Sequence, residues 1–137
     1  MLLQLKIYIC SIPSYICKKL TMIPDISGKW KFTEEFECGV DSGYAYLAQN
    51  ENYITGYLEY EEKIEDEDPF FVRQDISGDI TGHQISFQGV KVTDINGNIL
   101  PDYNLDTLDG TITHEGKIVG HSFDSEDICG VFVFERS

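Results

Sequence analysis

The sequence predicts an all-β chain that folds as an eight-stranded antiparallel up-and-down β-barrel, a meander with no substantial helix. No segment shows an apolar period of 3.6 residues over a helix-sized window, whereas β-type runs and tight turns alternate from Gly28 onward. A glycine inside a strand marks a place where a sheet coils sharply or another backbone comes close. Such glycines at matching places in successive strands indicate a repeated hairpin, and repeated hairpins favour a closed barrel. Four stretches share an apolar-x-Gly pattern: Ile54-Thr55-Gly56, Ile76-Ser77-Gly78, Leu108-Asp109-Gly110 and Ile118-Val119-Gly120.

The expected strands follow one another with short connections. Turn positions are chosen so that apolar side chains share one face, because a slip of one residue turns every side chain of a strand over. A turn at 50–51 pairs Leu47 with Ile54, and a turn at 82–83 pairs Ile80 with Ile85. The strands are expected at 28–37, 43–49, 52–60, 70–80, 84–92, 103–114, 117–124 and 128–136.

The seventh strand is placed by the turns on either side of it. A two-residue turn at 115–116 pairs Gly110 with His121, and a turn near 125–126 pairs His121 with Gly130. In these registers His121 and Phe123 point inward, and Gly120 points outward. His121 would occupy the gap between two glycines, either as a ligand-binding group or as a buried, hydrogen-bonded histidine.

Barrel closure requires the first strand to pair with the last. Pairing Trp30 with Arg136 also pairs Phe32 with Phe134. A register shifted by one residue would instead place Cys38 against Cys129 and permit a disulfide, but it loses the aromatic pair. We favour the first register, with both cysteines unbridged and on opposite faces, although a β-bulge would restore the disulfide.

The length of 137 residues predicts one domain, and the barrel is assigned to residues 22–137. Residues 1–21 hold three lysines, no acid, and an apolar run that Pro13 interrupts. This composition fits neither a signal peptide nor a membrane span. The segment is expected to be an extension, disordered or preceding a misassigned start at Met22. With no export signal, the thiols are expected to be reduced and the protein cytoplasmic.

The charge is strongly negative, with 24 acidic residues against 10 lysines and arginines and a formal net charge of −14. Residues 22–137 carry all 24 acids and only 7 of those bases, a net of −17. Nucleic acid is excluded as a partner because phosphate binding needs a basic surface. No cofactor motif, metal-ligand spacing or Ser/His/Asp grouping is evident. Glu34 is a candidate acid, but no second catalytic carboxylate is evident.

The opening Gly28-Lys29-Trp30, with Arg136 on the last strand, resembles the calycin superfamily of lipocalins, fatty-acid-binding proteins and avidins. Thr55-Gly56-Tyr57 is most similar to the avidin branch. The resemblance implies a barrel that binds a ligand inside, with the tryptophan and the basic residue packed across its closed end. The lipocalin Thr-Asp-Tyr turn motif, the C-terminal helix and the helical lid are missing. Trp30 is the only tryptophan, so biotin binding is not supported.

The inward aromatic residues are the candidate ligand-binding set. An eight-stranded barrel is about wide enough to fill itself with side chains or to hold one small ligand, and both alternatives stay open. The candidates in the barrel interior are Trp30, Phe32, Phe87, His121, Phe123, Phe132 and Phe134.

The outward face of the second and third strands is the candidate protein interface. Tyrosines at a surface are enriched in interfaces, although cross-strand aromatic pairs also stabilise a sheet without a partner. The acidic run 59–68 next to them is either a solvated loop or half of a docking surface for a basic protein. The interface candidates are Tyr44, Tyr46, Tyr57, Glu59, Glu61 and Glu62, with Tyr44 expected opposite Tyr57.

These features predict a non-enzymatic binding barrel for a small, mainly apolar ligand held in the barrel interior. The alternative is an acidic protein-binding module, such as an immunity or inhibitor protein that neutralises a basic toxin or nuclease. A barrel isomerase or cyclase is a third hypothesis. The presence or absence of an interior cavity discriminates between the first two.

Overall fold

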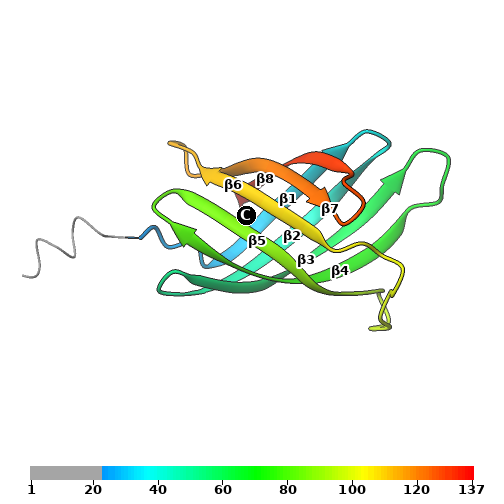
Figure 1. The fold of residues 1–137 in the computed structure, drawn as a ribbon, viewed down its shortest axis with the longest axis horizontal. Coiled ribbons are helices and arrows are strands. Elements are labelled where there is room, and N and C mark those ends of the chain that lie inside the picture. The colour runs from blue at the N-terminus through cyan, green and yellow to red at the C-terminus, as the bar shows by residue number, and fades with distance from the viewer. Residues whose placement is uncertain (1–22) are drawn as a thin grey trace, which may run out of the picture.

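A computed structural model describes residues 23–137, which form a closed antiparallel β-barrel in which each strand pairs with the next and β1 pairs with β8 (Figure 1). The predicted fold class is confirmed, and the predicted extension 1–21 lies outside the described residues. No helix long and apolar enough to cross a membrane occurs in the part that is described. The strands are β1 (Gly28–Phe36), β2 (Gly39–Asn50), β3 (Tyr53–Ile64), β4 (Phe70–Thr81), β5 (Gln84–Thr93), β6 (Asp106–Ile112), β7 (Ile118–Asp124) and β8 (Cys129–Arg136).

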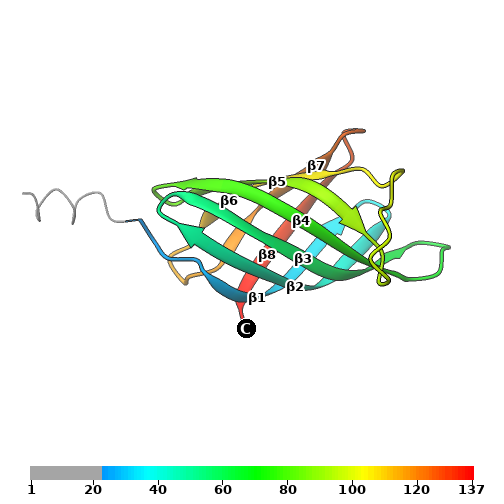
Figure 2. The same ribbon diagram turned by 90° about the horizontal axis from the view of Figure 1, so that it is seen from below.

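The two ends of the barrel differ. One end, called here the closed end, carries the turns 51–52, 82–83 and 113–117 and is covered by residues 23–27. The other, called the open end, carries the longer β3–β4 and β5–β6 loops and lies at the right in Figures 1 and 2.

The closed end is sealed by residues from both ends of the described chain. The Trp30 indole Nε1 donates to the carbonyl of Ile26 at 2.9 Å, and the Arg136 guanidinium lies 4.1 Å from the Trp30 ring centroid. Arg136 also donates to the backbone carbonyls of Asp25 and Ser27. The packing of tryptophan against arginine that the resemblance implied is therefore present, and β1 meets β8 in the predicted register, with Trp30 opposite Arg136.

The middle of the barrel is filled by aromatic side chains. Phe134 lies 5.5 Å from Phe32, 5.5 Å from Phe132 and 5.8 Å from Phe87, measured between ring centroids. Edge-to-face and stacked pairs at these distances contribute beyond the burial of their area. Trp30 and these four phenylalanines are at most 1% exposed. They lie inside as predicted, and they pack against one another.

The predicted orientation of β7 is wrong. Gly110 pairs with Gly120 instead of His121, and Phe123 pairs with Cys129 instead of Ile128. His121 therefore faces outward, and Phe123 is 40% exposed. Gly120 faces inward, and a Cβ built there would lie 2.0 Å from the carbonyl oxygen of Asp109.

Turn length is the reason for this error. Residues 113–117 form a five-residue connection with Gly116 at φ +87°, and residues 124–128 form another with Asp127 at φ +63°. Each has one residue in the left-handed region, as in hairpins that combine a type I turn with a bulge. The predicted register is off by one residue in one direction between β6 and β7, and by one residue in the other direction between β7 and β8. The prediction therefore turns β7 over but leaves the inward faces of β6 and β8 correct.

The β2–β3 pairing differs from the prediction by two residues, which preserves the faces of both strands. The turn lies at 51–52, Tyr46 pairs with Tyr57, and Tyr44 pairs with Glu59. The predicted Tyr44–Tyr57 pair is therefore wrong. Cys38 and Cys129 are exposed and unbridged.

Candidate functional site

Three carboxylic acids lie side by side inside the open end of the barrel. Asp41 on β2 pairs directly with Glu34 on β1 and with Glu62 on β3. Glu34, Asp41 and Glu62 are 6%, 2% and 7% exposed. Like charges directly opposite one another destabilise a sheet, and a buried charge is costly unless it is paired. The predicted place of Glu62 on the outer interface is wrong, because it belongs to this interior row.

Hydroxyl groups supply some of the hydrogen bonds to this row. Tyr103, in the β5–β6 loop, donates from its hydroxyl to Glu62 Oε1 at 2.6 Å, and the Ser122 hydroxyl donates to Glu34. The Tyr103 hydroxyl also lies 2.8 Å from the Tyr60 hydroxyl. No basic side chain takes part: the four ion pairs among residues 23–137 all involve other acids.

A fourth carboxyl group completes the polar end of the interior. Gln74 on β4 donates to Asp106 Oδ2 at 2.9 Å and accepts the Asp106 backbone N–H at 3.0 Å. Burial raises the pKa of Asp106 to about 7, and the charge of Glu34 adds to this effect. Gln74 lowers it in part, since it donates a hydrogen bond to the carboxylate.

Asp41 is the member of the row whose hydrogen bonding is incomplete. Its Oδ1 atom is fully buried and has no hydrogen-bond donor as partner. Burial, hydrogen bonding to Glu34 and the charges of Glu62 and Glu34 raise the pKa of Asp41 far above its ordinary value. With its pKa raised in this way, Asp41 keeps its proton at neutral pH.

These carboxyl groups line a cavity of about 310 Å³ at the open end. That volume is at the lower limit of the range for small-molecule sites, about 300–1,000 Å³. Further acidic residues lie around the cavity as well: Glu67 and Asp102 in loops, and Asp124 at the end of β7. Its apolar lining consists of Phe36, Ile64, Phe70 and Ile128. The cavity thus combines an acidic interior with an apolar wall near the surface.

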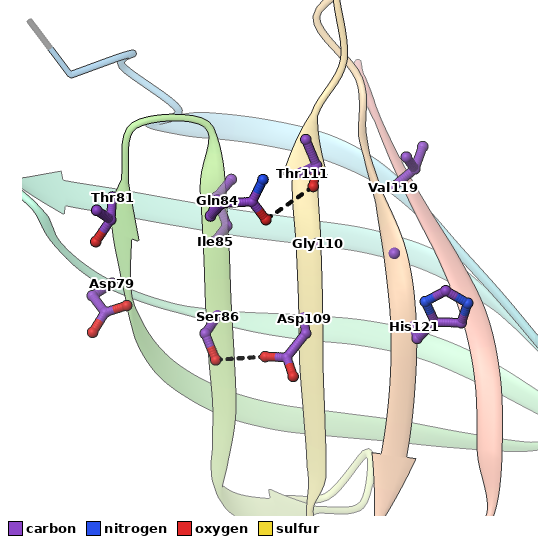
Figure 3. Close-up of a pocket in the computed structure, with 11 residues that line it drawn as sticks. Asp79, Thr81, Gln84, Ile85, Ser86, Asp109, Gly110, Thr111, Val119 and His121 are labelled. Atoms are coloured by element: carbon purple, nitrogen blue, oxygen red, sulfur yellow. Dashed lines mark hydrogen bonds between the residues drawn. The ribbon is translucent and has the colours of Figure 1, made fainter.

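A larger hollow of about 550 Å³ lies on the outer wall of β4–β7 (Figure 3). The paired residues Gly110 and Gly120 are among those that line it, together with outward side chains of the same strands such as Asp109. His121, predicted to lie inside the barrel, is at the edge of this outer groove. On the inner side, the Phe132 ring occupies the space beside Gly110, because a Cβ built there would lie 2.9 Å from it.

The outer groove does not contain a nucleophile activated by a base. Ser86, Asp109 and His121 lie in one row across β5, β6 and β7. The Ser86 hydroxyl donates to Asp109 at 2.7 Å, and Asp109 turns toward Ser86 and away from His121 (Figure 3). Nucleophilic catalysis needs the imidazole next to the hydroxyl, whereas here the aspartate separates them.

The outward tyrosines are engaged within the barrel wall. Tyr46 and Tyr57 stack with centroids 4.8 Å apart, and Tyr44 pairs with Glu59, while Glu61 binds Lys63 at 3.6 Å. Cationic side chains contact these rings: the Lys29 ammonium lies 4.2 Å from the Tyr44 ring centroid, and the Arg73 guanidinium lies 3.8 Å from the Tyr57 ring centroid, although Tyr44 is still 41% exposed. These contacts stabilise the sheet, and this stabilisation accounts for the outward tyrosines without a protein partner.

Of the three interior carboxyl groups, only Glu34 is predicted from the sequence as a candidate acid. Asp41 and Glu62 are not, because the predicted second strand begins at Gly43 and the predicted third strand ends at Tyr60. Both strands extend further, to Gly39 and Ile64. Continuing the alternation of inward and outward residues in each strand would have placed Asp41 and Glu62 beside Glu34.

Comparison with known proteins shows the fold alone. No family model and no curated protein matches the chain. Solved structures that are similar include two redesigned β-barrels. The first is a redesigned β-barrel, mFAP1, bound to DFHBI, at 14% identity and a TM-score of 0.57, covering 81% of this chain and 94% of that one. The second is the redesigned β-barrel b11L5F_LGL, at 12% identity and a TM-score of 0.55, covering 82% of this chain and 91% of that one.

Proposed function

We propose that this protein is a non-enzymatic binding barrel that holds a small ligand in the cavity at its open end. The observation that carries the proposal is that the interior changes character along the barrel axis. Aromatic side chains fill the middle, whereas a cavity of about 310 Å³ remains at the open end. Small barrels hold ligands at such mouths. The solved barrel mFAP1, which shares the fold, is bound to the small molecule DFHBI.

The position of the cavity changes which residues are expected to contact the ligand. Five of the residues predicted as ligand contacts lie in the packed core, and the other two, His121 and Phe123, face outward; the five are Trp30, Phe32, Phe87, Phe132 and Phe134. The ligand is therefore expected to contact the carboxyl row and the apolar wall formed by Phe36, Ile64 and Ile128. A ligand that is apolar throughout would leave the buried carboxyl groups facing a hydrocarbon surface, at a cost in desolvation.

The protein-binding alternative has less support. It depends on an exposed tyrosine and acidic face. Tyr44 is 41% exposed, but Glu62 lies inside the barrel, and the rings of Tyr44 and Tyr57 already contact the Lys29 and Arg73 side chains. A basic partner would compete with these two cations for the rings. The isomerase or cyclase hypothesis stays a prediction.

Methyl NMR with a panel of small fragments tests the proposal. Ile64 and Ile128 line the cavity, whereas Ile54 and Ile80 are fully buried away from it and serve as internal references. Binding at the open end is expected to shift the first two methyl signals and leave the other two unchanged. The proposal is wrong if no fragment shifts Ile64 or Ile128, or if the shifts concentrate on the outer groove.

Two cysteine variants supply a matched control. Cys38 and Cys129 are both exposed and free, but only Cys38 lines the cavity. Cys38→Trp is expected to obstruct the cavity and abolish fragment binding, and Cys129→Trp is expected to leave it intact. Equal effects of the two substitutions would contradict the proposed location.

A further inference from the structure

The unpartnered oxygen of Asp41 indicates what kind of ligand the cavity is built to accept. Asp41 lines the cavity, is 2% exposed, and its Oδ1 receives no hydrogen bond. A buried acceptor without a donor is costly, and natural structures rarely leave one. A ligand that donates hydrogen bonds at this position would satisfy the oxygen. The row of acids on either side makes a positively charged donor the most favourable one.

The geometry of the cluster favours an organic cation over a metal ion. Between residues 23 and 137, no group of three or more acidic, histidine or cysteine side chains is arranged to hold a metal. An ammonium group needs less strict geometry, because its three donors can turn toward separate acceptors. Asp41 and its cross-strand neighbours Glu34 and Glu62 provide those acceptors on three adjacent strands.

The rest of the cavity fits the remainder of such a ligand. Phe36 and Ile64 lie two residues beyond Glu34 and Glu62 on the same faces of their strands, toward the open end, and Ile128 lies in the β7–β8 loop. An alkyl or aryl group attached to the cation would contact this apolar wall. The acidic residues Glu67, Asp102 and Asp124 around the cavity also attract a cation toward it.

We therefore propose that the ligand is a small organic amine, with its ammonium group bound by Asp41, Glu34 and Glu62 and its apolar part against Phe36, Ile64 and Ile128. This inference rests on the proposed ligand-binding function and names the ligand class. It also predicts a proton release. In the free protein Asp41 holds a proton, and an ammonium group bound beside it would ionise the carboxyl group and release that proton to solvent.

Other titratable groups near Asp41 also affect how amine affinity depends on pH. Glu34 faces it from β1 and Glu62 from β3, and the Tyr103 hydroxyl binds Glu62 from the β5–β6 loop. Asp106 lines the same cavity from β6. Since every one of these groups is an acid and no base joins them, amine affinity is expected to increase as the pH rises through neutrality.

Calorimetry with 2-phenylethylamine and its neutral isostere 2-phenylethanol tests the inference. The amine is expected to bind at least about tenfold more tightly, since hydrogen bonds to charged groups are worth about 1.5–3 kcal/mol. Titrations in buffers of different ionisation enthalpy are expected to show about one proton released per amine bound. Asp41→Asn is expected to weaken amine binding about 10- to 100-fold and to abolish the release. Asp79→Asn, the same substitution at an exposed acid on the outer wall, is the control and is expected to leave amine binding unchanged.

The outcomes separate this inference from the proposed function. If both compounds shift the Ile64 and Ile128 methyl signals equally, or if Asp41→Asn leaves the amine affinity unchanged, the amine assignment is wrong and the binding function stands. If neither these compounds nor any fragment of the panel shifts the two signals, the binding function itself fails. Glu62→Gln provides a second variant, which is expected to weaken the binding of 2-phenylethylamine more than that of 2-phenylethanol.

Discussion

Replacing Asp41 by asparagine is expected to stabilise the ligand-free barrel by an amount that depends on pH. The folded protein must keep Asp41 protonated, because burial and the neighbouring Glu34 and Glu62 oppose its ionisation. The unfolded chain has no such constraint, and its aspartate ionises near pH 4. Asparagine has nearly the same shape, needs no proton, and can donate N–H groups to both glutamates.

The sign and size follow from linkage. The pKa of Asp41 is higher in the folded state than in the unfolded chain. Below about pH 4 both states are protonated and there is no penalty, while above it the unfolded state is increasingly favoured by about 1.4 kcal/mol per pH unit. From about pH 4 to 7 the penalty on the wild type reaches about 4 kcal/mol. Asp41→Asn should remove this penalty. The variant is therefore expected to be about as stable as the wild type near pH 4 and more stable by about 4 kcal/mol at about pH 7.

Urea unfolding followed by fluorescence of Trp30, the only tryptophan, measures this difference at several pH values. Asp106 also titrates within the interval, with a pKa near 7, but Asp41 is not among the groups that shift it. Its contribution therefore cancels when the two proteins are compared. Asp79→Asn controls for the loss of one negative charge. A stability difference that does not change with pH, or a variant less stable than the wild type at about pH 8, would refute the reasoning.

Three further substitutions test the rest of the structure. Phe134→Ala, at a fully buried ring in contact with four aromatic neighbours, is expected to lower the free energy of unfolding by about 3–5 kcal/mol, whereas Phe123→Ala, 40% exposed, is expected to cost much less in the same urea titration. Gly120→Ala should cost about 1–3 kcal/mol or more by overpacking, because its Cβ would lie 2.0 Å from a carbonyl oxygen; a change below the error of the titration would contradict the corrected β7 register. Tyr57→Ala should reduce stability by about 0.5–1.5 kcal/mol through loss of the Tyr46 stack and leave fragment binding at the open end unchanged, while loss of that binding would show that the tyrosine face contributes to the site.

The barrel could be predicted from the sequence because its signals are local. Alternation of apolar residues sets the face of each strand, and the Trp30–Arg136 register places the aromatic pair Phe32 and Phe134 together. The orientation of β7 could not be predicted in the same way. It depends on whether a turn holds one extra residue in the left-handed conformation. Gly116 is a signal for such a turn, but Asp127 adopts the conformation without being a glycine.

The candidate site could be predicted only in part for a different reason. The expected strands 28–37 and 43–49 leave Asp41 in the connection between them, and Glu62 falls in the acidic run 59–68 that is predicted as part of the outer interface. The β1–β2 pairing brings Asp41 beside Glu34, the β2–β3 pairing brings Glu62 beside Asp41, and the β5–β6 loop brings Tyr103 over Glu62. The first two contacts follow from strand alternation once the strand ends are known, whereas the contact with Tyr103 joins residues far apart in the chain and no local pattern in the sequence encodes it.

The carboxyl row and the aromatic core are best understood together. Phe32 lies two residues before Glu34 on β1, and Tyr60 two residues before Glu62 on β3, so acids take the inward positions where each strand would otherwise continue its apolar series. A barrel selected for stability alone would carry apolar side chains there, because replacing buried charged groups by well-packed apolar ones is often stabilising. Keeping three acids at this depth, beside a cavity and without an internal cation, is a cost in folding that a bound cation would reverse. Asp41→Asn tests both halves of this argument, since the same substitution is expected to raise the stability of the free barrel and to weaken its binding of an amine.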